Sequence, residues 1–105
     1  LNCPQLVENA NRVIRILKDN SENSINESFF KEQAEKDLYT AIKTVSETND
    51  YKTYLKELET LNPVVTKFFD DVLVMDKDEN VKKNRLSLLT LLKKKYEHLT
   101  DFSKV

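Results

Sequence analysis

The 105-residue sequence contains no glycine, and it has only two prolines, one cysteine and no tryptophan. Phosphate-cradling loops, dinucleotide-binding fingerprints and nucleophile elbows depend on glycine, because their backbone approaches a ligand closely or adopts positive φ. Tight hairpin turns also favour glycine, so they are disfavoured here. Connections between helices can be made with Asn, Ser and Asp and do not need glycine. The composition therefore excludes the common nucleotide-binding loops and favours an all-helical protein.

Other shortages narrow the class of protein further. The single cysteine, Cys3, cannot form an internal disulfide, and no signal-peptide pattern opens the sequence, so we expect a reducing, cytoplasmic setting. No apolar run approaches the roughly 20 residues that span a membrane, and we expect no membrane contact. Charged residues make up 33% of the sequence but sum to a formal net charge of −1, so any basic surface must be local.

Apolar residues recur at spacings of three and four along almost the whole sequence, which is the pattern of amphipathic helices. Polar segments interrupt this pattern, and their Asn, Asp, Ser and Pro residues favour turns and helix caps. The sequence therefore predicts an all-α bundle of four or five helices, forming one domain over residues 1–105. Because it begins at Leu1 rather than at methionine, we expect it to be a fragment of a larger subunit. The expected breaks lie at Asp19 to Asn26, near Asn49, near Leu61-Asn62 and at Asp76 to Asp78.

Two of these breaks carry capping signals. Asn49-Asp50 precedes an apolar run that starts at Tyr51, so it is predicted to cap a short helix. Asn62-Pro63 supplies an N-cap residue followed by a proline at the first helical position, where the missing N–H costs nothing. We expect a helix to begin there and to extend to the acidic segment Asp76 to Asp78. Its apolar face comprises Val65, Phe68, Phe69 and Val72.

The sequence gives little support for metal binding or catalysis. The first, third and fifth positions of a calcium loop are matched by Asp76, Asp78 and Asn80. An EF-hand also needs glycine at the sixth position and glutamate at the twelfth, but Val81 and Ser87 stand there. The only histidine, His98, has no companion at ligand spacing. We expect no metal, cofactor or catalytic residue in this segment.

Positively charged residues form two candidate surfaces for nucleic acid. Arg12, Arg15 and Lys18 recur every three residues and project away from the apolar face of the first predicted helix. Lys82 and Lys83, followed by Lys93 to Lys95, supply further positive charge near the end of the sequence. Such side chains contact phosphates with salt-dependent affinity that ignores sequence, although the same pattern is also typical of a solvated helix face.

Arg85 stands out because helical spacing places it within the apolar stripe of Val81 and Leu88. A charge at such a position must find a partner or lose several kcal/mol of solvation. Two interpretations remain open, namely an ion pair with Asp70 or Asp71 of the preceding helix, or a guanidinium presented to RNA. A similar choice, between core packing and stacking on RNA bases, is open for the four tyrosines, Tyr39, Tyr51, Tyr54 and Tyr96.

Several short blocks occur in the order found in one known family. They are Asn11-Arg12-Val13 with Ile16-Leu17-Lys18, Glu32 to Leu38, Phe68-Phe69-Asp70 with Val74-Met75, Asn84-Arg85-Leu86, and Asp101-Phe102-Ser103. From about Leu6 to Ser103 the sequence resembles the DALR-type anticodon-binding domain that closes the β subunit of bacterial glycyl-tRNA synthetase. The arginyl-tRNA synthetase version is less similar, because its Pro-His segment and its extended carboxyl-terminal motif are missing here.

The resemblance implies a non-catalytic RNA-binding module within a ligase. In this family an α2β2 enzyme binds ATP, Mg²⁺ and glycine on its α subunit, while the β subunit recognises tRNA(Gly). The implied partners are tRNA(Gly), the rest of the β subunit and the α subunit. A synthetase of the arginyl type and a helical protein-interaction module are the alternatives. The residues that we expect to contact RNA are Arg12, Arg15, Lys18, Lys82, Lys83 and Arg85.

Overall fold

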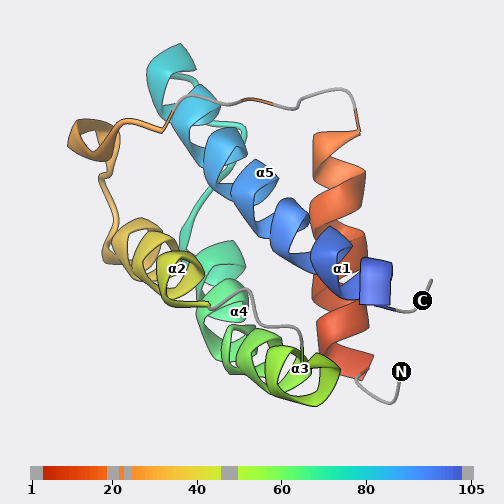
Figure 1. Cartoon of the computed structure of the whole chain (residues 1–105). Helices are drawn as coiled ribbons and strands as arrows, with labels where there is room; N and C mark the ends of the chain where they lie inside the picture. Colours follow the sequence, from red (N-terminus) through yellow and green to blue (C-terminus); the bar gives the residue numbers. More distant parts are fainter. Residues whose placement is uncertain (1–3, 19–21, 23–24, 46–49, 103–105) are drawn as a thin grey trace.

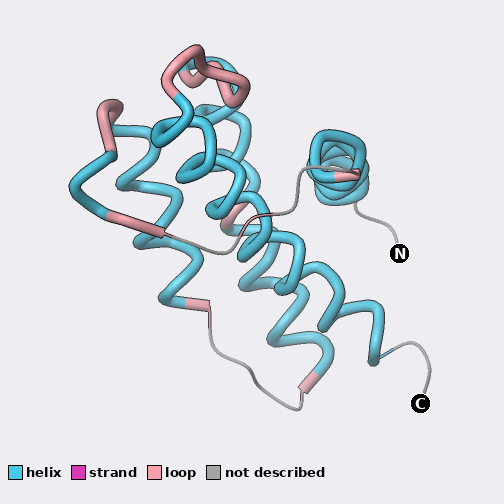
Figure 2. The backbone as a smooth tube through the Cα atoms, turned by 90° about the horizontal axis from the view of Figure 1, so that it is seen from above, coloured by secondary structure: helices cyan, strands magenta, loops and turns pink. Residues whose placement is uncertain are grey.

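The computed structural model describes residues 4–18, 22, 25–45 and 50–102, and the regular structure within these ranges is entirely helical (Figure 2). The all-α class predicted from the sequence is therefore confirmed. The elements in chain order are α1 (Pro4–Leu17), the short 3-10 helix η1 (Glu27–Phe29), α2 (Gln33–Thr44), α3 (Tyr51–Thr60), α4 (Asn62–Asp71) and α5 (Glu79–Phe102).

The longest helix, α5, spans 24 residues and is the element around which the others are arranged (Figure 1). It contacts α1, α2, α3 and η1, and Figure 1 shows α1 and α2 on opposite sides of it. Helix α4 also contacts both α1 and α2, as well as α3. The two outer helices are thus joined through α4 and α5.

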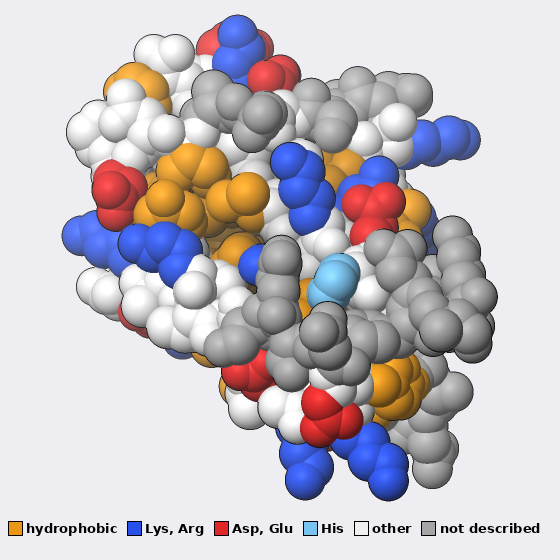
Figure 3. All heavy atoms as spheres, viewed as in Figure 1, with side chains coloured by type: hydrophobic (Ala, Val, Ile, Leu, Met, Phe, Trp, Pro, Cys, Tyr) orange, Lys and Arg blue, Asp and Glu red, His pale blue; other side chains and the backbone are white. Residues whose placement is uncertain are grey.

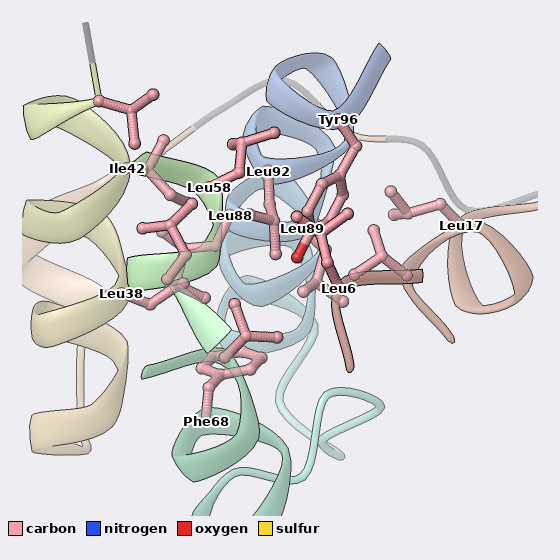
Figure 4. Packing of buried hydrophobic residues seen from close by; sticks show 14 of the residues in the cluster. Leu6, Leu17, Leu38, Ile42, Leu58, Phe68, Leu88, Leu89, Leu92 and Tyr96 are labelled. Carbon is pink, nitrogen blue, oxygen red and sulfur yellow. The ribbon is translucent and has the colours of Figure 1, made fainter. Parts of the chain in front are cut away.

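One cluster of buried apolar side chains, drawn from all five α-helices, forms the core (Figure 4). Leu88, Leu89 and Leu92 of α5 are fully buried, and Leu86 on another side of the same helix is 2% exposed. Helix α5 therefore contacts neighbours on more than one side. Each such leucine contributes roughly 1.5 to 3 kcal/mol by leaving water, so α5 supplies a large part of the stability of the fold.

Helix α4 begins one residue earlier than the sequence predicted. Leu61 is the N-cap residue and has helical dihedral angles, with φ −76° and ψ −21°, so α3 passes into α4 through a single residue. Pro63 still lies in the first turn, where its missing N–H is harmless. The side chain of Asn62 does not cap the helix, because its Oδ1 accepts a hydrogen bond from Asn9 Nδ2 at 3.4 Å.

Helix α4 also ends earlier than predicted, at Asp71 rather than at the acidic segment. The backbone becomes extended at Val72, and the side chains then alternate. Val72 and Val74 are buried, whereas Leu73 is 68% exposed and Met75 is 49% exposed. β-Branched residues such as Val72 favour extended backbone, and the chain then bends at Val74 and Met75. Residues 72–78 therefore form a longer connection to α5 than expected.

The connection from α1 to α2 is attached to α5 by hydrogen bonds. The backbone N–H of Asn26 donates to Asn84 Oδ1 at 2.7 Å, and that of Glu22 donates to Thr90 Oγ1 at 3.3 Å. Asn26 in turn caps η1, which the sequence did not predict, by accepting from the backbone N–H of Ser28. The predicted loop lies partly outside the described residues, which omit 19–21 and 23–24.

The break before α3 is confirmed on the side that the structure describes. Asp50 stands at the N-cap position of α3, and its carboxylate accepts a hydrogen bond from the hydroxyl of Thr53. This hydroxyl is the main reason why the pKa of Asp50 lies below its usual value. The other predicted capping residue, Asn49, lies outside the described residues.

Candidate nucleic-acid interface

A polar hollow of about 410 Å³ lies between α1 and α4. Arg12 and Arg15, two of the residues predicted to contact RNA, line it from α1. Glu8 is the only carboxylate among the residues that line the hollow in the described part of the chain, so cations exceed anions there by two to one. The remaining walls are formed by Gln5, Asn9, Thr66 and Phe69.

The Arg12 side chain is held in place by the neighbouring helix. Its guanidinium carbon lies 4.2 Å from the centroid of the Phe69 ring, which is the geometry of a cation–π contact. Within α1, Gln5 donates to Asn9 Oδ1 at 3.2 Å, and Asn9 Nδ2 in turn donates across to Asn62 Oδ1 of α4 at 3.4 Å. The contact with Phe69 therefore holds the Arg12 side chain against α4 at the wall of the hollow.

The other predicted lysines do not line this hollow. Lys18 is exposed in the turn directly after α1. Lys82 and Lys83 lie in the first turns of α5, where Lys82 forms an ion pair with Glu79 at 3.4 Å. Lys83 is exposed. The structure therefore brings Arg12 and Arg15 together in one site and leaves these three lysines on other surfaces.

The structure places Arg85 in the interior, where its side chain is 4% exposed. One terminal nitrogen donates to Glu35 Oε1 at 3.0 Å, and the other donates to the carbonyl of Leu73 at 2.6 Å and to Asp76 Oδ2 at 3.3 Å. Of the two interpretations of Arg85, the ion pair with a carboxylate is therefore the one that the structure supports. The guanidinium is not presented to RNA, and Arg85 is removed from the candidate contact residues.

The predicted partners of Arg85, Asp70 and Asp71, were wrong. Both are exposed, and Asp71 instead forms an ion pair with Lys67 at 2.9 Å. The true partner, Glu35, is fully buried and also accepts hydrogen bonds from the backbone N–H groups of Lys31 and Glu32. A signal for it exists in the sequence, because Glu35 lies beside the apolar stripe of α2 just as Arg85 lies within that of α5.

Burial separates the four tyrosines into two groups. Tyr54 is 0% exposed and donates its hydroxyl to the carbonyl of Lys95 at 2.7 Å, and Tyr96 is 5% exposed, so both belong to the core. Burial also raises the pKa of the Tyr96 hydroxyl. Tyr39 and Tyr51 are only partly buried. Tyr39 lies between Phe30, at a ring-centroid distance of 5.6 Å, and Lys43, whose Nζ is 4.4 Å from its ring centroid.

Among the residues that the structure describes, no group of three or more His, Cys, Asp and Glu side chains is placed to hold a metal ion. Within the same ranges no helix is long and apolar enough to cross a bilayer. Asp76 and Asp78, which resembled part of a calcium loop, have structural roles. Asp76 accepts from the backbone N–H of Asp78, and Asp78 accepts from those of Asn80 and Val81 at the start of α5.

Comparison with known proteins identifies the fold family. The family model of the DALR anticodon binding domain matches residues 6–99. The chain belongs to this family. The match covers α2, α3 and α4 completely and most of α1 and α5, and it includes Arg12, Arg15 and the buried pair of Arg85 and Glu35.

The chain is also similar to the β subunits of glycine–tRNA ligases. It is 38% identical over 101 residues to that of Citrifermentans bemidjiense, a match that covers 90% of this chain and 15% of the relative. Identity is 39% over 103 residues for Aquifex aeolicus, covering 97% and 15% of the two chains. For Streptococcus gordonii it is 35% over 105 residues, covering 99% and 16%. The chain thus spans about 15% of the length of these curated relatives.

Proposed function

We propose that this chain is the tRNA-binding module of a glycyl-tRNA synthetase β subunit and that it contacts the anticodon region of tRNA(Gly). The observation that carries this proposal is the match of an anticodon-binding family model to residues 6–99. Relatives that are 35 to 39% identical bear the name glycine–tRNA ligase β subunit, and they support glycine as the amino acid that the proposed synthetase attaches to tRNA. The module binds RNA and supplies no catalytic group.

In the complete enzyme, the module assists a reaction that takes place elsewhere. We infer a cytoplasmic α2β2 ligase in which the α subunit binds ATP, Mg²⁺ and glycine. The rest of the β subunit connects that catalytic centre to this module. Binding energy gained here then raises the fraction of enzyme that holds tRNA(Gly), without altering the chemistry of glycine activation.

The hollow between α1 and α4 is the best candidate for phosphate contact. A guanidinium is planar and offers parallel N–H donors that match two phosphate oxygens, so two neighbouring arginines suit an RNA backbone. The cation–π contact with Phe69 reduces the conformational freedom that Arg12 would lose on binding. Because the net charge of the chain is −1, attraction to RNA must come from such a local site and should weaken as salt rises.

Binding titrations at two salt concentrations test the proposal. Labelled tRNA(Gly) and a tRNA with a different anticodon are titrated with the chain, its Arg12→Gln/Arg15→Gln variant, and a control with Lys52→Gln/Lys56→Gln. The control removes two exposed lysines of α3 and therefore matches the change in charge. We expect the chain to bind tRNA(Gly) more tightly than the other tRNA. In the arginine variant only, the slope of log affinity against log salt concentration should fall by about one unit for each phosphate contact that is lost.

Two results would contradict the proposal in different ways. Equal affinity for both tRNAs would mean that the module binds RNA without reading the anticodon region. Absence of binding to either tRNA at low salt would remove the function from this chain. If the arginine variant instead bound like the lysine control, the function would stand and the contact residues would have to be sought on another surface.

A further inference from the structure

Helix α2 carries an aromatic side chain between two lysines on its outward side. Lys36, Tyr39 and Lys43 are spaced by three and four residues, which places them along one stripe of the helix. The ammonium of Lys43 lies 4.4 Å from the centroid of the Tyr39 ring, and the Phe30 ring meets Tyr39 edge-on at 5.6 Å and 63°. We call Phe30, Lys36, Tyr39 and Lys43 the Tyr39 patch.

The Tyr39 patch is open to solvent, in contrast to the tyrosines of the core. Phe30 and Tyr39 are both only partly buried, and both lysines are exposed. In Figure 3, hydrophobic side chains reach the surface in the region bordered by α2, the segment after η1 and α5, and Lys or Arg side chains lie beside them. An accessible aromatic ring next to positive charge is the combination that binds unpaired nucleic-acid bases.

The carboxylates near the patch are engaged in local structure. Glu32, at the start of α2, belongs to a capping box and accepts a hydrogen bond from the backbone of the first turn. Asp37, on the next stripe of the helix, accepts from the side-chain amide of Gln33 at 2.9 Å. Both remain negatively charged, but neither shares an ion pair with Lys36 or Lys43 within the described residues.

We propose that the Tyr39 patch binds an unpaired RNA base. The base displaces the Lys43 ammonium from the face of the Tyr39 ring and stacks there, while Lys36 and the displaced Lys43 contact the phosphates on either side. The two lysines are seven residues apart, about 10 Å along the helix axis, and they flank the ring. Lysine is depleted from the centres of protein–protein interfaces, so a ring between two lysines favours RNA over a protein partner. The inference rests on the proposed function and adds a second RNA contact to it.

This second contact is separate from the hollow of Arg12 and Arg15. The patch belongs to α2 and the hollow to α1 and α4, and α1 and α2 lie on opposite sides of α5 (Figure 1). The two surfaces can therefore be altered independently. We expect the hollow to contact only the phosphates of the RNA backbone. The patch, by contrast, is expected to bind a base that is not paired within an RNA helix.

A fluorescent base analogue tests the stacking directly. The anticodon stem-loop of tRNA(Gly) is prepared with 2-aminopurine at one loop position, and a control RNA carries 2-aminopurine in the paired stem. We expect the chain to quench the loop probe on binding, because 2-aminopurine loses fluorescence when it stacks. Tyr39→Phe should preserve the quenching, whereas Tyr39→Leu should abolish it and weaken binding by about fivefold or more. The stem probe should not respond to either substitution.

The lysines provide a second measurement that leaves the ring contact between Phe30 and Tyr39 in place. For stem-loop binding, the slope of log affinity against log salt concentration should fall by up to about two units in Lys36→Gln/Lys43→Gln. The α3 control Lys52→Gln/Lys56→Gln should leave this slope unchanged. All variants are first compared by thermal unfolding. If Tyr39→Leu unfolds early, the lysine pair and the Tyr39→Phe quenching decide the question.

The possible failures can be told apart. If a folded Tyr39→Leu variant binds the stem-loop with unchanged affinity and quenching while Arg12→Gln/Arg15→Gln loses affinity, the inference is overturned and the proposed function stands. The patch would then be a surface for a protein neighbour. If the wild-type chain fails to bind the stem-loop at low salt, both the inference and the proposed function are overturned.

Discussion

Arg85 of α5 and Glu35 of α2 form an ion pair in which both side chains are buried, although 50 residues separate them in the sequence. The same guanidinium reaches the carbonyl of Leu73 and the carboxylate of Asp76 in the connection before α5. One side chain therefore fixes the start of α2, the start of α5 and the segment that leads into it. Because each partner neutralises the other, removing one leaves a buried charge.

Replacement of Arg85 by alanine should be strongly destabilising. Glu35 would remain fully buried without its cation, and we expect a loss of roughly 3 to 5 kcal/mol of unfolding free energy, measured by urea denaturation. The double variant Arg85→Met/Glu35→Gln removes both charges, keeps a side-chain oxygen for the N–H groups of Lys31 and Glu32, and should recover most of this loss. An unchanged denaturation midpoint in Arg85→Ala would show that the side chain is not part of the interior in solution.

Stability should fall at acidic pH in a way that depends on Asp76. The backbone N–H of Asp78 and, secondarily, the charge of Arg85 hold the pKa of the Asp76 carboxyl below its usual value of 3.8. A depressed folded-state pKa means that the stabilisation is complete above the unfolded-state pKa and is lost as pH falls through the folded-state pKa. Asp76→Asn should therefore be less stable than wild type near pH 6, and the difference should shrink below about pH 4. A difference that is constant across this range would contradict the assignment.

Neighbouring residues in the connection between α4 and α5 should differ sharply in their sensitivity to truncation. Val74 is 7% exposed and Leu73 is 68% exposed. We expect Val74→Ala to cost about 1 to 2 kcal/mol, because two buried methyl groups are removed, and Leu73→Ala to change stability by less than about 0.5 kcal/mol. Thermal or urea unfolding measures both. Equal effects would mean that the segment does not alternate between interior and surface.

Charge reversal in the hollow should affect aminoacylation only through tRNA. If the proposed function is right, Arg12→Glu/Arg15→Glu in the whole ligase should raise the KM for tRNA(Gly), because the two substitutions remove phosphate contacts remote from the reaction that activates glycine. Glycine activation, followed by pyrophosphate exchange without tRNA, should keep its rate. An unaltered KM for tRNA would assign both arginines to a solvated face and direct attention to Lys82-Lys83 and Lys93 to Lys95.

The helices and their order could be predicted from the sequence because apolar spacing and capping residues are local properties. The helix that follows Leu61 was predicted with nearly the right start, but its end was not. Val72 continues the helical stripe of Val65 and Phe68, and it fits an extended segment equally well. Only packing against the rest of the molecule decides between these two conformations.

The candidate site was predictable in part for a related reason. Helical spacing identified Arg12 and Arg15 as an outward-facing pair and Arg85 as a charge in an apolar stripe. It could not name Glu35 as the partner of Arg85 or distinguish the accessible Tyr39 from the buried Tyr54, because both outcomes depend on which helices lie side by side. Such non-local information enters only with the tertiary structure.

The central place of α5 also bears on how the protein is made. Synthesis proceeds from α1 toward α5, yet α1 finds its packing partners in α4 and α5, and α2 finds its own in the same two helices. While α5 is still inside the ribosome, α4 can already contact α1, α2 and α3, but these helices lack the buried leucines of α5 that complete the core. Stable structure should then appear in one late step, after Leu88, Leu89 and Leu92 have emerged, and until that moment the nascent helices remain open to chaperones and proteases.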